Sequence, residues 1–80
     1  MQFTDKEILD KLTHAEMRIL RELSSGKTAR EIGKALYLSP KTCRNHMANI
    51  RSKLKIFGFH SLLKFAIEHR HLFNGIDQMK

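Results

Sequence analysis

Apolar residues recur along this chain at the three- and four-residue spacing of amphipathic helices, and no segment alternates as a half-buried strand would. Thr4, Thr13 and Thr28 are each followed three positions later by a Glu, a pair that can satisfy free backbone N–H groups at a helix start. Ser39 before Pro40 marks a further start. The pattern predicts an all-α chain with helices over residues 4–11, 13–25, 29–36, 40–55 and 61–72.

The segment 40–55 has two unlike faces. Its apolar residues fall within about 60° of one another on a helical wheel; they are Cys43, Met47, Ile50 and Leu54. The opposite side carries Lys41, Arg44, Asn45, Ala48, Arg51, Ser52 and Lys55. That side has no acid. Arg and Lys suit phosphates, Arg and Asn can make bidentate contacts with base edges, and Ala permits close approach. This face is typical of a helix that enters a DNA groove.

The charge of the chain points to the same segment. Its 80 residues include 15 Lys and Arg against 8 Asp and Glu, a net charge of +7. No acid occurs from Ile32 to Ile67, and the basic residues of that stretch account for the whole excess. A concentrated basic surface indicates a polyanionic partner, because neutralising phosphates releases counterions. Charge alone leaves open a membrane surface or a face that only interacts with solvent.

The helices 29–36 and 40–55, joined by a short turn, form a helix-turn-helix unit. Residues 12–16, 26–32 and 38–46 resemble the LuxR-type (GerE-like) DNA-binding domain, as in the C-terminal domains of NarL/FixJ-class response regulators. The resemblance implies an all-α, four-helix domain over residues 12–72. A short helical extension or linker, 1–11, would precede it, and a tail, 73–80, would follow. Gly33 stands where the family commonly has Ala, a difference expected to change little.

The resemblance also implies roles for individual residues. Residues on the helix 40–55 are expected to contact bases: Arg44, Asn45, Ala48 and Lys41. Five others are expected to contact phosphates: Thr28, Arg30, Thr42, Lys53 and Arg51. The last helix is the dimerisation element of the family, and its expected interface residues are Leu62, Leu63, Phe65 and Ala66.

These expectations define a transcription regulator, or the DNA-binding domain of one, that binds double-stranded DNA as a homodimer in the cytoplasm. RNA polymerase is a further candidate partner. No cofactor, metal or membrane is expected as a partner, since the chain has one Cys and no apolar run near the roughly 20 residues of a membrane span. No nucleophile motif, carboxylate pair or phosphate-binding loop is present, so an enzyme is not expected.

Two alternatives remain from the residues. The last helix carries more apolar surface than three short helices would cover, which fits a protein-interaction module that binds or inhibits another regulator. Binding of RNA or single strands is disfavoured, because exposed aromatic residues are not interleaved with the basic ones along the sequence.

Overall fold

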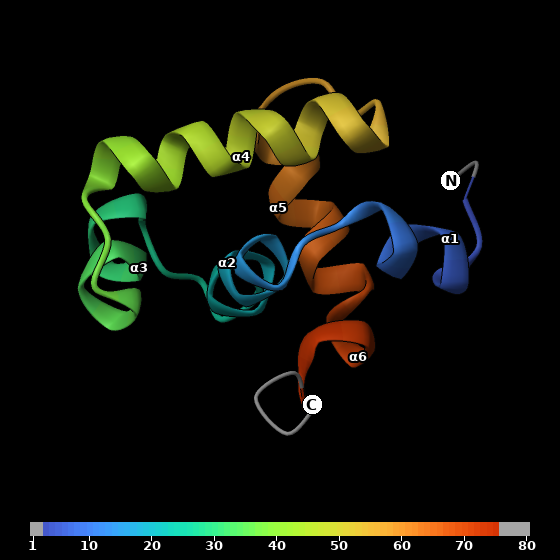
Figure 1. Cartoon of the computed structure of the whole chain (residues 1–80), viewed down its shortest axis with the longest axis horizontal. Coiled ribbons are helices and arrows are strands. Elements are labelled where there is room, and N and C mark those ends of the chain that lie inside the picture. Colours follow the sequence, from blue (N-terminus) through green and yellow to red (C-terminus); the bar gives the residue numbers. More distant parts are fainter. Residues whose placement is uncertain (1–2, 76–80) are drawn as a thin grey trace.

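The structure is a computed structural model that describes residues 3–75. Over that range the chain forms helices and no strand, which confirms the all-α prediction. The helices in chain order are α1 (Asp5–Lys11), α2 (His14–Ser24), α3 (Ala29–Leu36), α4 (Pro40–Leu54), α5 (Phe59–Glu68) and α6 (Arg70–Phe73) (Figure 1).

The predicted helix starts are confirmed at the level of hydrogen bonds. At the start of α2, the Thr13 N–H donates to Glu16 Oε1 at 2.9 Å, and the Glu16 N–H donates to Thr13 Oγ1 at 3.1 Å. The same reciprocal pair begins α1 and α3. Ser39 caps α4, whose first residue is Pro40. Local chemistry within four residues therefore sets where these helices begin.

The central helix of the fold is α2, which contacts α3, α4, α5 and α6. In Figure 1, α4 runs above α2 and α3; the chain then loops back behind α4, and α5 descends from beneath the middle of α4 past α2. The predicted apolar face of α4 is buried in full: Cys43, Met47, Ile50 and Leu54. This packing holds α4 across the top of the domain and leaves its other side exposed.

Both ends of the domain extend beyond the expected boundaries 12–72. Ile8 of α1 is fully buried and α1 contacts α4, so the N-terminal segment packs on the domain as a helical extension. Phe73, expected in the tail, is also fully buried, on α6. The rest of the predicted tail from residue 76 onward lies outside the described residues. The last predicted helix, 61–72, is in fact two helices that meet at His69.

The turn of the helix-turn-helix unit closes over Gly33. Tyr37 adopts the left-handed conformation, with φ 60°, and the Leu38 N–H donates to the Gly33 carbonyl at 2.8 Å. A Cβ atom at position 33 would clash with the Leu38 carbonyl oxygen. The expectation that Gly33 in place of Ala changes little is therefore wrong, because the backbone of the turn occupies the space of that methyl group.

Candidate nucleic-acid interface

The four residues expected to contact bases lie on the exposed side of α4. They are Lys41, Arg44, Asn45 and Ala48, and all are solvent-exposed. Ser39 supplies the N-cap by accepting from the Thr42 N–H at 3.1 Å, and α4 contains no acidic residue. The helix thus presents cationic and amide groups without a carboxylate that would repel phosphate or compete for these donors.

The residues expected to contact phosphates come from two helices. Thr28 and Arg30 are exposed at the start of α3, where Thr28 Oγ1 accepts from the Glu31 N–H at 3.2 Å. Arg51 and Thr42 are half-buried on α4. The Ser39 hydroxyl donates to Thr42 Oγ1 at 2.9 Å, and the Thr42 hydroxyl can still donate to a phosphate oxygen.

Lys53, the fifth residue of this group, is held by an ion pair. Its Nζ lies 2.7 and 2.9 Å from the two carboxylate oxygens of Glu16 on α2. The Glu16 side chain is only 4% exposed. Burial raises the pKa of Glu16, but hydrogen bonds from Lys53 and the Thr13 backbone outweigh that effect and hold the pKa below its usual value. A phosphate contact by Lys53 would therefore compete with this bond between α2 and α4.

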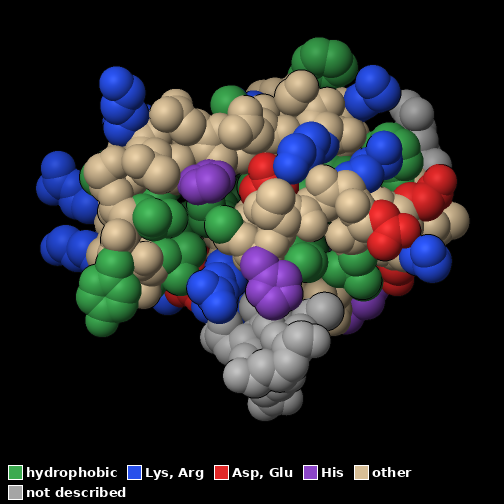
Figure 2. All heavy atoms as spheres, viewed as in Figure 1, with side chains coloured by type: hydrophobic (Ala, Val, Ile, Leu, Met, Phe, Trp, Pro, Cys, Tyr) green, Lys and Arg blue, Asp and Glu red, His purple; other side chains and the backbone are tan. Residues whose placement is uncertain are grey.

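The acidic side chains are unevenly distributed over the visible face of the molecule. Figure 2 shows most of the acidic side chains of the visible face at its α1 end, where Lys and Arg side chains also lie, whereas the opposite end, near α3 and the start of α4, shows mainly Lys and Arg. This distribution agrees with the acid-free stretch from Ile32 to Ile67. A DNA strand approaching the end formed by α3 and α4 would meet mainly positive charge.

Three of the four residues expected at a dimer interface are in the core of the chain itself. Leu62 and Ala66 are fully buried and Phe65 is 3% exposed, while Leu63 is half-buried. The expectation for Leu62, Phe65 and Ala66 is therefore corrected: these side chains are part of the chain's own core. The exposed apolar residues of α5 are Phe59 and Ile67.

The structure brings aromatic residues next to basic ones, which sequence order did not suggest. An open hollow of about 260 Å³ is lined by Ala29, Arg44, Met47, Arg51 and Phe59. A second hollow beside it is lined by Arg51, Ser52, Lys55, Ile56 and Phe57. Phe57 is 86% exposed, so an exposed aromatic residue lies beside basic ones in space although the two kinds are not interleaved along the sequence. The signal was the pair of Phe residues around Gly58, which sequence reasoning took only as a connection.

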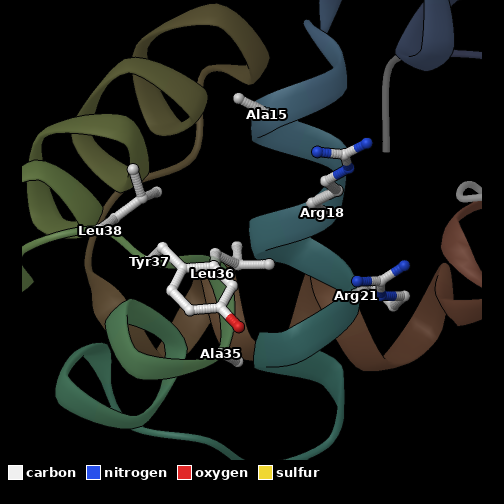
Figure 3. A pocket seen from close by; sticks show the side chains of 7 residues that line it. All are labelled: Ala15, Arg18, Arg21, Ala35, Leu36, Tyr37 and Leu38. Carbon is white, nitrogen blue, oxygen red and sulfur yellow. The ribbon is translucent and has the colours of Figure 1, made fainter.

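A different hollow, of about 370 Å³, lies between α2 and the turn after α3. Figure 3 shows Tyr37 and Leu36 on one side of it and Arg18 and Arg21 of α2 on the other. None of its lining residues belongs to the set expected to contact DNA. It is a separate feature from the α3 and α4 surface.

The described residues contain no group of three or more His, Cys, Asp or Glu side chains that could hold a metal ion. Cys43 is buried in the core, and that burial raises the pKa of its thiol. Among residues 3–75 no helix has both the length and the apolar character needed to cross a membrane.

Comparison with known proteins agrees with this geometry. The family described as "Bacterial regulatory proteins, luxR family" matches residues 10–66. The chain is 34% identical over 65 residues to an uncharacterized transcriptional regulatory protein, YhcZ, of Bacillus subtilis. It is 43% identical over 47 residues to the transcriptional regulatory protein LiaR of the same species, and 39% identical over 61 residues to the Fimbriae Z protein of Salmonella typhimurium.

These matches cover 81%, 59% and 76% of this chain, respectively, but only 30%, 22% and 29% of the relatives. The chain thus spans less than a third of the length of each of these three relatives. No solved structure is significantly similar to it.

Proposed function

The chain belongs to the luxR family of bacterial regulatory proteins, and we propose that it binds duplex DNA with α4 in the major groove. DNA-binding transcription regulation is the function of this family's domain, and it is not an enzyme class. The observation that carries the proposal is the acid-free exposed side of α4 beside the start of α3. In a helix-turn-helix protein, the second helix reads base edges while phosphate contacts fix its orientation.

The proposal assigns roles within that surface. Arg44 and Asn45 read base edges, Lys41 contacts a base from the amino end of α4, and Ala48 allows close approach to a base. The phosphate contacts come from the start of α3 and from α4: Thr28, Arg30, Thr42 and Arg51. Lys53 contacts phosphate only if DNA competes with Glu16 for its ammonium group.

The proposed complex contains two copies of the chain on DNA. The exposed side of α5, with Leu63 half-buried and Ile67 46% exposed, supports a contact between copies. Two α4 helices would then occupy half-sites about 34–36 Å apart. Sedimentation of the complex on duplexes with one or two half-sites tests this, since a single copy bound to both duplexes contradicts the dimer. RNA polymerase as a partner and a cytoplasmic location remain predictions of the family resemblance.

The alternative of a protein-interaction module has lost its main support. It rested on apolar surface that the last helix could not cover within the chain. Leu62, Phe65, Ala66 and Phe73 are instead buried in this chain's own core.

The direct test is affinity for mixed-sequence duplex DNA over a series of salt concentrations. Binding should weaken with salt, with a log–log slope near −0.9 for each phosphate neutralised. The same sequence as a single strand serves as a competitor. Failure to bind duplex at low salt, or preference for the single strand, contradicts the proposal.

Base reading is tested on a site selected from a random DNA pool. Arg44→Ala should cost about 1–3 kcal/mol on that site and relax its sequence preference. Lys34→Ala is the control, because it removes an exposed charge from α3 that has no proposed base contact. Equal losses for Arg44→Ala on selected and random duplexes would instead assign Arg44 to phosphate.

A further inference from the structure

The hollow lined by Ala29, Arg44, Met47, Arg51 and Phe59 joins three helix segments. Ala29 is the first residue of α3, Phe59 is the first residue of α5, and the other three lie on α4. We call this feature the Phe59 hollow. It lies on the flank of α4, because Arg44 and Arg51 stand between the buried apolar face and the most exposed side of that helix.

The lining of the Phe59 hollow combines two kinds of chemistry. Arg44 and Arg51 supply guanidinium groups, and none of the five lining residues is acidic. Ala29, Met47 and Phe59 supply an apolar wall, in which Met47 is buried while Phe59 is 46% exposed. A ligand that suits both parts carries an anion beside an apolar ring. The sugar–phosphate backbone of DNA has this alternation, with phosphates between the carbon faces of successive deoxyriboses.

The position of the hollow fits the expected path of a DNA strand. Ala29 lies in sequence between Thr28 and Arg30, the two residues of α3 with proposed phosphate contacts. A strand held there would continue along the flank of α4 into the Phe59 hollow. Beyond it the adjacent hollow, which shares Arg51, carries Lys55. Positive charge thus follows one line from the start of α3 to the end of α4.

We propose that the Phe59 hollow seats one sugar–phosphate unit of the strand that borders the major groove, with Arg51 on the phosphate and Phe59 against the deoxyribose. This inference rests on the proposed function and adds to it an aromatic contact from α5, outside the helix-turn-helix unit. The contact is independent of base sequence, so it positions α4 and does not read the site.

The test compares Phe59→Ala with wild type on random and selected duplexes. Loss of the apolar contact should weaken binding about fivefold on both duplexes. The salt slope should not change, because no charge is removed. Arg51→Met should instead reduce the magnitude of the slope by about 0.9, the value for one phosphate. Tyr37→Ala is the matched control, since Tyr37 is a 95% exposed aromatic residue in the hollow between α2 and α3.

A second measurement does not depend on the stability of the Ala variant. A photoreactive p-benzoylphenylalanine at position 59 keeps an aromatic ring there and should crosslink to duplex DNA, whereas the same group at position 37 should not. Full affinity of Phe59→Ala together with no crosslink at position 59 overturns the inference while the proposed function stands. If the wild-type chain binds no duplex, both the inference and the proposed function are wrong. Crosslinking that occurs only with single-stranded DNA overturns the inference in favour of base stacking on Phe59.

Discussion

At the scale of single residues, Gly33 shows how closely the helix-turn-helix unit is packed. We predict that Gly33→Ala destabilises the fold by about 1–3 kcal/mol, because the added methyl group meets the Leu38 carbonyl and the turn must shift. Urea denaturation measures the change, with the exposed Lys34→Ala in the same helix as control. Ala is ordinarily better than Gly inside a helix by about 1 kcal/mol, so an equally or more stable variant would contradict the packing argument.

A second prediction at this scale concerns the ion pair between Glu16 and Lys53. Lys53→Met should lower the free energy of unfolding by about 1–3 kcal/mol, because it leaves the buried Glu16 carboxylate without its cation. Glu16→Gln should cost less, since Gln can keep the capping box and the charge left unpaired is then Lys53, whose side chain is 37% exposed to solvent. Chemical denaturation of both single variants and the double variant gives the coupling between them.

DNA binding separates this structural role of Lys53 from a phosphate contact. If the ion pair is its main role, Lys53→Met should leave the salt slope of duplex binding unchanged. A slope that flattens as it does for Arg51→Met would restore Lys53 to the phosphate contacts.

At the scale of helices, α4 ends at a residue whose backbone conformation is unusual for its type. Lys55 is the C-cap and adopts the left-handed conformation, with φ 57°, which favours Gly. Lys55→Gly should therefore stabilise the fold by about 0.5–1 kcal/mol, measured by thermal unfolding. Lys55→Ala is the control, because it removes the same charge and keeps the left-handed strain. Equal stability of the Gly and Ala variants would show that the backbone conformation is not what matters there.

At the scale of the whole molecule, four glutamates couple stability to pH. The backbone and side chain of Thr4 lower the pKa of Glu7, and those of Thr28 do the same for Glu31. For Glu22, burial raises the pKa, but hydrogen bonds from Lys27 and Arg21 lower it by more than burial raises it. Glu16 is lowered in the same way by Lys53 and Thr13. In each case the carboxyl has a pKa below its ordinary value of 4.5 in the folded chain.

The sign of the pH dependence follows from these shifts. The stability that the four carboxylates contribute is fully present above the unfolded pKa, near 4.5, and is lost as pH falls through the lower folded values. We predict that the Tm falls between about pH 5 and pH 3, and that Glu16→Gln shows a shallower fall. Thermal unfolding followed by circular dichroism checks both. A Tm that is constant over this range would contradict the assigned hydrogen bonds.

The sequence by itself determined where the first four helices begin and the character of α4. Three Thr–Glu pairs and Ser39–Pro40 act within four residues, so their capping was predictable from local order. The apolar spacing of α4 likewise predicted its buried face, and the missing acids predicted the sign of its exposed one. Periodicity carries this information because it depends on a single helix and not on what packs against it.

Only the tertiary structure decided which side chains remain exposed for contact with a partner. It buried Leu62, Phe65 and Ala66 in the core, and it brought Phe59 beside Arg44 and Arg51. The bond between Lys53 and Glu16 joins residues 37 positions apart. Spacing within a helix shows that a face is apolar or charged, but not which other helix covers it. That depends on how the helices cross, which local spacing does not encode.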